Sequence, residues 1–256
     1  MLELKKVTKV YNPGLVTEMC LFQNFNLKVD DGEFISVVGS NGSGKTSMLN
    51  IICGSIPING GEVLINGKSI NKLKEFQRYA KIGRVYQNPS MGNAPNMTIL
   101  ENLSLADNKG KPFGLSMAIN KKRFDYFREQ LASLGLGLED KLHVKMGLLS
   151  GGQRQAVSLL MATMTELDFL ILDEHTAALD PKTAETIMEL TDRIVREKHL
   201  TAIMVTHNLR YAVEYGSRIM MDKGNIIMDK SGDEKKNATI DDILDVFNRI
   251  SIECGN

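Results

Sequence analysis

The segment Gly39–Thr46, which reads Gly-Ser-Asn-Gly-Ser-Gly-Lys-Thr, constrains the fold of this chain more than any other feature. A short apolar run at 34–38 leads directly into it, and apolar residues at helical spacing follow it (Met48, Leu49 and Ile52). In this strand–loop–helix context the glycines let consecutive backbone N–H groups turn inward, and the helix directs its positive end at the same point. The sequence therefore predicts an α/β fold that carries a phosphate-binding P-loop.

The side chains of this loop predict a bound ATP and a Mg²⁺ ion. We expect Lys45 to reach the β- and γ-phosphates, the Thr46 hydroxyl to ligate Mg²⁺, and Ser47 to contact the α-phosphate. The rest of the loop is expected to contribute to ATP binding as well (Gly39, Ser40, Asn41, Gly42, Ser43 and Gly44). A glycine-rich turn that matches by chance is the alternative, and the flanking strand and helix argue against it.

A second apolar run, at 169–172, ends in two carboxylates, Asp173 and Glu174. Ligands of open α/β sheets bind at the carboxyl ends of the strands, so a buried strand of this kind delivers both side chains to that edge. We expect Asp173 to hold Mg²⁺ and Glu174 to polarise the attacking water as a general base. An acidic strand end that leads into a surface turn is the other interpretation, which the P-loop disfavours.

A third motif, Leu-Ser-Gly-Gly-Gln at 149–153, opens a predicted helix about 100 residues after the P-loop. A serine and two glycines at a helix N-terminus form an anion site, because the free N–H groups and the positive end of the helix dipole favour negative charge. A plain helix cap is the alternative. We expect four residues of this signature segment to contact ATP: Ser150, Gly151, Gly152 and Gln153.

These three motifs, with the Leu-Ser-Gly-Gly-Gln segment about twenty residues before the acidic strand, resemble the nucleotide-binding subunit of ATP-binding cassette (ABC) transporters. The resemblance implies a head-to-tail dimer, in which residues 150–153 of one subunit close on the ATP held by the other. It implies that Gln87 is the Q-loop glutamine, a ligand of Mg²⁺ or of the attacking water, and that His207 is the H-loop histidine at the γ-phosphate. It further implies that Tyr11 stacks on adenine and that Asp180 belongs to the D-loop, which bridges the subunits.

One residue departs from the common pattern of that family. His175 follows the catalytic glutamate, where Pro is usual. It is either a variant tolerated in a turn or a titratable group close to the phosphates at the dimer interface. The segment from Asp173 to Asp180 also resembles bacterial importer ATPases that work with amino-acid-type substrate-binding proteins.

The resemblance also implies the domain organisation. We expect a single ABC ATPase domain over 1–256, with an ATP-binding core at about 1–87 and 166–256. This core is expected to be a RecA-like mixed sheet with an antiparallel β subdomain. An inserted α-helical subdomain of ABC type, which carries the signature segment, is expected at 88–165. A capping-box pattern predicts a final amphipathic helix over Thr239–Ile250.

Composition limits the possible partners and the compartment. Lys+Arg and Asp+Glu are both 31, so the chain has no basic excess for nucleic acid. Three widely separated cysteines without a C-x-x-C pair indicate reduced thiols and a cytoplasmic protein. No apolar run approaches the roughly 18 residues of a membrane span, so any membrane-spanning partner must be another chain.

The predicted function is therefore an ATPase subunit that powers import through a separate permease, at the inner face of the cell membrane. A second copy of the chain is the expected cassette partner, and an extracytoplasmic substrate-binding protein takes part indirectly. An exporter or a lipoprotein-releasing ATPase shares every motif. A soluble ABC ATPase of DNA repair or translation is disfavoured by the single cassette, and a silent regulatory cassette by the intact catalytic residues. The sequence leaves the transported substrate open.

Overall fold

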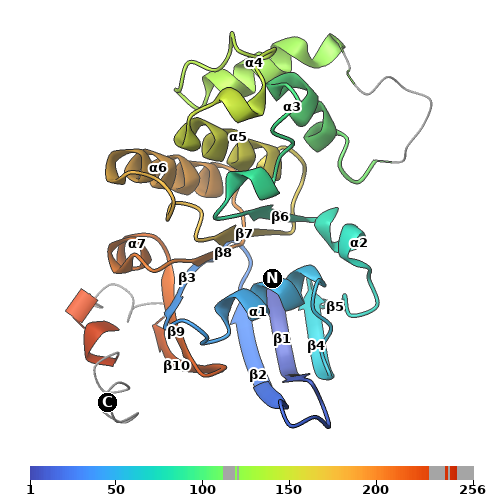
Figure 1. The fold of residues 1–256 in the computed structure, drawn as a ribbon, viewed down its shortest axis with the longest axis vertical. Coiled ribbons are helices and arrows are strands. Elements are labelled where there is room, and N and C mark those ends of the chain that lie inside the picture. Colours follow the sequence, from blue (N-terminus) through green and yellow to red (C-terminus); the bar gives the residue numbers. More distant parts are fainter. Residues whose placement is uncertain (112–118, 120, 231–239, 242, 247–256) are drawn as a thin grey trace. The chain divides into compact units, whose positions relative to one another are not determined.

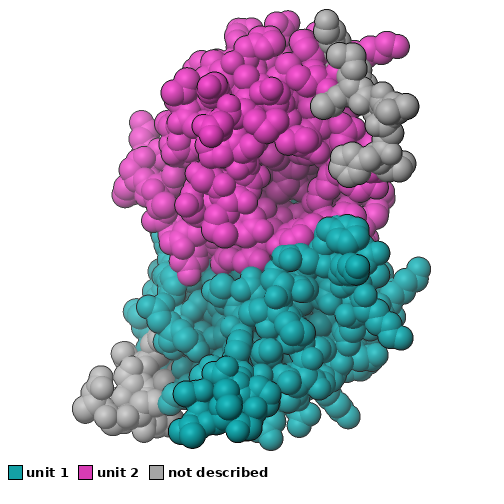
Figure 2. Space-filling view, turned by 45° about the vertical axis from the view of Figure 1, so that its right-hand side comes forward, with its two compact units in different colours: residues 1–78, 199–256 teal, residues 79–198 magenta. Residues whose placement is uncertain are grey.

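The computed structural model describes most of the chain and divides into two compact units (Figures 1 and 2). The residues outside the description are 112–118, 120, 231–239, 242 and 247–256. The first unit comprises 1–78 and 199–256, and the second comprises 79–198. These boundaries differ from those expected for an ATP-binding core and a helical subdomain. The division into that core and that subdomain stays a prediction. The expected helix over Thr239–Ile250 lies only partly within the described residues, where 240–241 and 243–246 are helical.

An antiparallel sheet in the first unit has the strand order β2-β1-β4-β5. Alternating apolar residues bury one face at the start of β1, as shown by Leu2 and Leu4, and a register shift after Leu4 brings Val7 into the core as well. Asn66 and Gly67 both have positive φ, which is the backbone of a tight hairpin turn between β4 and β5. The strands are β1 (Leu2–Tyr11), β2 (Met19–Val29), β4 (Gly60–Ile65) and β5 (Lys68–Ser69).

A second set of strands in the first unit runs in the order β10-β9-β3-β8. β3 is parallel to both β8 and β9, and β10 completes an antiparallel hairpin with β9. β3 is buried apart from its first residue and β8 is buried throughout, as their continuous apolar runs predict. The elements are β3 (Phe34–Gly39), β8 (Ala202–Val205), β9 (Ser217–Asp222), β10 (Asn225–Lys230), α1 (Lys45–Cys53) and α7 (Leu209–Glu214).

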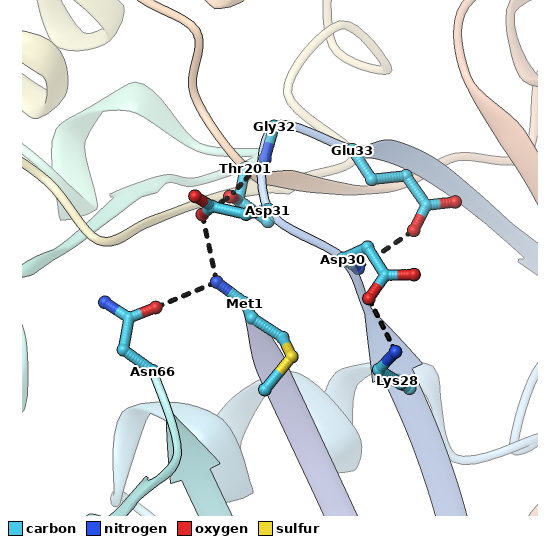
Figure 3. A network of polar contacts seen from close by, with 8 residues as sticks. All are labelled: Met1, Lys28, Asp30, Asp31, Gly32, Glu33, Asn66 and Thr201. Atoms are coloured by element: carbon cyan, nitrogen blue, oxygen red, sulfur yellow. Dashed lines mark hydrogen bonds and ion pairs between the residues drawn. The ribbon is translucent and has the colours of Figure 1, made fainter.

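The first residue of the chain is held by a polar network in this unit (Figure 3). The Met1 amino group donates to Asp31 Oδ1 at 3.1 Å and to Asn66 Oδ1 at 2.9 Å. The Thr201 hydroxyl accepts from the Gly32 N–H at 2.9 Å and donates to Asp31 at 3.2 Å. The hydrogen bonds from the terminal amine and from Thr201 lower the pKa of Asp31. The network therefore joins the two chain segments that make up this unit.

The second unit combines two parallel strands with helices. β6 and β7 are parallel, and β7 is buried up to its last residue. Side-chain caps begin three helices: Thr98 and Ser150 each form a capping box, and Asp180 caps the helix that starts at Pro181. The elements are β6 (Ile82–Val85), α3 (Ile99–Asp107), α4 (Phe124–Ala132), α5 (Gly151–Thr163), β7 (Phe169–Asp173) and α6 (Pro181–Glu197). Short 3₁₀ turns lie at Pro89–Met91, Lys121–Arg123 and Met146–Leu148, and α2 (Glu75–Tyr79) lies where the first segment of the first unit ends.

The mixed α/β architecture, with both antiparallel and parallel pairing, confirms the predicted fold class. Among the described residues, no helix combines the length and the apolar character that a membrane crossing requires.

Candidate functional site

The P-loop follows β3 and depends on glycines at three positions. Gly39, Gly42 and Gly44 have φ values of 153°, 79° and 103°, a region that side chains strongly disfavour. A Cβ at Gly39 would also lie 2.2 Å from the Met221 carbonyl oxygen of the neighbouring strand β9. The loop backbone therefore adopts a shape that only this glycine pattern allows.

Lys45 begins α1 and folds back over the loop. Its buried ammonium donates to the carbonyl oxygens of Gly39 at 2.7 Å and Ser40 at 2.8 Å, and to Ser43 Oγ at 3.4 Å. Thr46 is exposed in the first turn of α1, and that turn holds no acidic side chain. A cation, the N-terminus of a helix and an exposed hydroxyl at one point are the features that an anion such as a nucleotide phosphate requires.

The turn between β9 and β10 also contacts the loop, which the motif analysis missed. Ser40 Oγ donates to Asp222 Oδ1 at 3.2 Å, and the Gly224 N–H donates to the Ser43 carbonyl at 3.0 Å. The signal in the sequence was the place of Asp222 at the end of a strand. Because β9 is parallel to β3, its carboxyl end lies at the same edge of the sheet as the P-loop.

Tyr11 and His207 both lie in the first unit with the P-loop. The Tyr11 hydroxyl donates to Ser47 Oγ at 3.3 Å, so the tyrosine contacts the helix that follows the loop. His207 is exposed two residues beyond β8. The parallel register pairs Val37 with Val205, which brings the residues after each strand to the same edge. The first unit thus gathers the residues expected at the adenine, along the phosphates and at the γ-phosphate.

Asp173 and Glu174 lie in the second unit, at the end of β7. The register of β6 and β7 pairs Val85 with Leu172, so the exposed Gln87 follows its strand at the same edge as these carboxylates. Arg84 on β6 forms an ion pair with Asp173, with 2.6 Å between Nη2 and Oδ2. Only 6% of the Arg84 side chain and 13% of the Asp173 side chain are exposed. The sequence analysis missed this ion pair, because Arg84 belongs to no motif.

The helix that the signature segment opens is bonded to the segment around Gln87. From α5, the buried Gln155 donates through Nε2 to the Tyr86 carbonyl at 3.0 Å. Asn93, further along the same loop, donates to Ser158 Oγ on α5 at 3.1 Å. These contacts were also missed, and a polar residue on the apolar face of a predicted helix was the available signal. The backbone next to Gln87 is therefore hydrogen-bonded to α5 inside this unit.

The signature segment forms a reciprocal cap at the start of α5. Ser150 Oγ accepts from the Gln153 N–H and Gln153 Oε1 accepts from the Ser150 N–H, both at 3.2 Å. A Cβ at Gly152 would lie 2.2 Å from Thr183 Cγ2, in the first turn of α6. Asp180 caps that turn by accepting from the Thr183 N–H at 3.1 Å. Close packing against α6 within one subunit therefore already requires glycine at position 152. Ser150 is exposed.

His175 does not occupy the position required of a titratable group close to the phosphates. Its side chain is 1% exposed and packs against α6, where Nε2 lies 3.1 Å from Thr191 Oγ1. Burial lowers the pKa of His175 from 6.5 to about 4, so the imidazole is neutral at physiological pH. The interpretation of His175 as a titratable group facing phosphates is therefore wrong, because the ring is directed into the core.

These features define a class of protein. A P-loop at the carboxyl edge of parallel strands, with two carboxylates ending another buried strand, is the construction of P-loop nucleotide-binding proteins.

Comparison with known proteins identifies the family. Residues 22–177 match the ABC transporter family. The tyrosine transport ATP-binding protein of Clostridioides difficile (strain R20291) is 44% identical over 248 residues, which cover 96% of this chain and 98% of that protein. The phosphonates import ATP-binding protein PhnC of Lactococcus lactis subsp. cremoris (strain SK11) is 31% identical over 255 residues, covering 95% and 98%. A solved ATP-binding cassette, dimeric and bound to ADP and Pi in a post-hydrolysis state, is 33% identical, with a TM-score of 0.76 and coverage of 90% and 98%.

This chain therefore belongs to the ABC transporter family. It is an ATP-binding and ATP-hydrolysing subunit of a transporter, as the motifs predicted.

Proposed function

We propose that this ATPase powers the import of a small solute through a separate membrane permease, and that it works at the inner face of the cell membrane. The P-loop geometry carries the proposal, because three left-handed glycines and the buried Lys45 build a site for nucleotide phosphates. The direction of transport rests on the relatives, which include an import protein for phosphonates.

We assign the nucleotide contacts in the first unit as follows. The loop N–H groups and the Lys45 ammonium bind the β- and γ-phosphates, and Ser47 contacts the α-phosphate. Tyr11 stacks on adenine, supported by its hydrogen bond to Ser47, which places its ring beside the phosphate-binding helix. His207 contacts the γ-phosphate, supported by the shared edge of β3 and β8.

We propose that the bound metal ion is Mg²⁺. Thr46, Gln87 and Asp173 would hold it, and all three supply the oxygen ligands that Mg²⁺ prefers. When bound, Mg²⁺ neutralises charge on the β- and γ-phosphates.

Hydrolysis then depends on Glu174 as the base that polarises the attacking water. The Lys45 ammonium and the His207 ring stabilise the negative charge that develops on the γ-phosphate. The partly exposed position of Glu174 directly after the buried strand β7 supports this role, since the carboxylate is reachable while its backbone is anchored.

We further propose that two copies of the chain form the working unit. Residues 150–153 of one copy would contact the ATP of the other, with Asp180 in the segment that bridges them. The exposure of Ser150 at the N-terminus of α5 supports this, because the positive end of a helix dipole attracts phosphate. A solved cassette similar to this chain is dimeric.

A pocket in the second unit is the proposed grip for the permease. Its volume is about 280 Å³, and it lies between the loop that follows β6 and the helices α3 and α5. Leu105, one of the residues that line it, has an exposed apolar side chain. Residues that line the pocket include Tyr79, Arg84, Tyr86, Leu105, Lys109 and Met161, of which Leu105 and Met161 offer apolar contact to a short helix.

The transported solute is proposed to be an amino acid, delivered by an extracytoplasmic substrate-binding protein. The relative that is 44% identical is named for tyrosine transport, which makes tyrosine the first solute to test.

The ATPase assignment is tested with purified wild-type and Glu174→Gln proteins. We expect the variant to bind MgATP as tightly as the wild type, to turn it over at least about 100-fold more slowly, and to accumulate as an ATP-bound dimer. A nucleotide titration reports the binding of MgATP, phosphate release reports the turnover, and light scattering reports the dimer. Normal turnover by Glu174→Gln would refute the base assignment.

The transport assignment is tested by purifying Glu174→Gln from native membranes and identifying bound chains by mass spectrometry. We expect a multi-span permease, together with uptake of tyrosine that is lost when this chain is deleted. Ribosomal or DNA-repair proteins in place of a permease would contradict import.

A further inference from the structure

Glu174 holds an unusual backbone conformation for a residue with a side chain. Its φ is 48°, in the left-handed region. Such a conformation costs about 1 kcal/mol or more and persists only when the surrounding structure imposes it. On one side the residue is anchored by β7, which is buried up to Asp173. A turn follows, in which the Ala177 N–H donates to the Glu174 carbonyl at 2.9 Å.

The anchor on the other side of Glu174 is the side chain of His175. The ring is buried, and its Nε2 lies 3.1 Å from Thr191 Oγ1 on the 17-residue helix α6. The Thr191 hydroxyl donates its hydrogen to the Ile187 carbonyl at 2.7 Å, and a carbonyl can only accept. The hydrogen between His175 and Thr191 must therefore be on Nε2. The tautomer of His175 is therefore the one in which Nε2–H donates and Thr191 Oγ1 accepts.

We propose that His175 is a positioning residue for hydrolysis, which aims the Glu174 carboxylate through its hydrogen bond to Thr191. The proposal rests on the proposed role of Glu174 as the base. The buried strand β7 and the buried face of helix α6 fix the two neighbours of Glu174, so the direction of its Cα–Cβ bond is set. Without the tether the turn could relax toward the right-handed region, and the carboxylate would point elsewhere. A displacement of about 1 Å at a catalytic group can slow a reaction by about 100-fold.

The first test compares His175→Leu with His175→Gln. Leucine fills the space and removes the donor, whereas glutamine carries an amide N–H at a similar reach. We expect His175→Leu to lower kcat by about 10- to 100-fold while KM and Kd for ATP stay at the wild-type values. We expect His175→Gln to recover most of that kcat. A His175→Leu enzyme with wild-type kcat, or parallel losses of kcat, ATP affinity and melting temperature in both variants, would overturn the proposal.

The second test approaches the same bond from α6. Thr191→Val keeps the shape and removes the acceptor, and Thr191→Ser keeps the hydroxyl as the matched control. We expect Thr191→Val to lower kcat as His175→Leu does, and the double variant to be no slower than either single one, because one bond is lost in each case. Additive losses in the double variant would contradict action through this bond.

Glu174→Gln, measured alongside, distinguishes failure of the positioning role of His175 from failure of the base assignment of Glu174. If Glu174→Gln abolishes turnover while His175→Leu and Thr191→Val leave kcat unchanged, the base assignment stands and the positioning role fails. If Glu174→Gln turns over normally, the proposed function itself fails, whatever the other variants do.

Discussion

At the scale of single residues, Arg84 and Asp173 show how strongly this protein depends on a charge pair. Both side chains are almost fully buried, and they face each other at 2.6 Å from neighbouring strands. The Arg84 guanidinium also lies over the Tyr86 ring, 4.7 Å from its centroid. Burial removes water from both charges, so each depends on the other for compensation.

Removal of Arg84 should therefore destabilise the protein even without nucleotide. We expect Arg84→Gln to lower the free energy of unfolding by about 3 kcal/mol, because the Asp173 carboxylate would stay buried without its partner. The double variant Arg84→Gln/Asp173→Asn should regain much of this loss, since the unpaired charge is gone. Urea unfolding of the nucleotide-free proteins measures both values, and equal stability of the wild type and Arg84→Gln would disprove the dependence.

The buried His175 predicts a pH dependence of stability. Its pKa is lowered by burial from 6.5 to about 4, so between these values the unfolded chain binds a proton that the folded chain does not. Stability contributed by this residue is complete above pH 6.5 and falls as the pH falls toward 4, by up to about 3 kcal/mol. His175→Gln should therefore lose less melting temperature than the wild type between pH 7 and pH 4.5. Parallel melting curves across this range would contradict the prediction.

At the scale of elements, the starts of α5 and α6 approach so closely that one methyl group matters. Gly152 in the first turn of α5 faces Thr183 in the first turn of α6, at a distance that leaves no room for a Cβ. The neighbouring Gly151 faces only the flexible end of Leu179, 3.3 Å from its would-be Cβ. The two glycines of the signature segment are therefore not equivalent.

This difference predicts the outcome of single alanine substitutions. We expect Gly152→Ala to destabilise the protein by about 1–3 kcal/mol through overpacking, and Gly151→Ala to cost less. Thr183→Ser removes the opposing methyl group and keeps the backbone N–H that Asp180 caps, so it should rescue Gly152→Ala. Thermal unfolding of the four proteins gives the comparison, and no rescue by Thr183→Ser would show that the contact is not the cause.

At the scale of the whole molecule, the candidate residues are divided between the two units. The P-loop, Tyr11 and His207 belong to the first unit, whereas Gln87, the signature segment and both carboxylates belong to the second. Within the second unit, Gln155 bonds the helix of the signature segment to the backbone before Gln87. Docking of a permease at the pocket in this unit would therefore displace the segment of Gln87 and helix α5 together.

The role of the signature segment in the proposed dimer can be tested separately from ATP binding. In the Glu174→Gln background, Ser150→Arg should bind MgATP normally and remain monomeric, because a bulky cation would occupy the N-terminus of α5. Ser150→Thr keeps the capping hydroxyl and serves as the control that still dimerises. Equilibrium sedimentation with ATP distinguishes the two, and dimers of the arginine variant would contradict a trans contact at this segment.

Much of the fold could be predicted because its signals are local. The strand before the P-loop, the helix after it and the Asp180-Pro181 start of α6 each follow from a few adjacent residues. The hairpin at Asn66-Gly67 and the capping hydroxyl of Ser150 are equally short-range. The order of the motifs was sufficient to predict the family, which the comparisons confirm.

Other features could not be predicted, since they depend on which distant segments meet. Arg84 and Asp173 pair across 89 residues of chain, and no motif marks the arginine. Whether His175 faces solvent or α6 is decided by the direction in which the turn after β7 leaves the strand.

The amino-acid sequence by itself determined that this protein has a P-loop, an acidic strand and a signature helix cap, because propensity, glycine placement and capping act within a few residues. The tertiary structure alone decided that Asp173 is paired with Arg84, that Gly152 has no room for a side chain, and that His175 is buried and neutral. The physical reason is that burial, charge compensation and steric exclusion belong to pairs of residues, and those pairs exist only once the chain has folded.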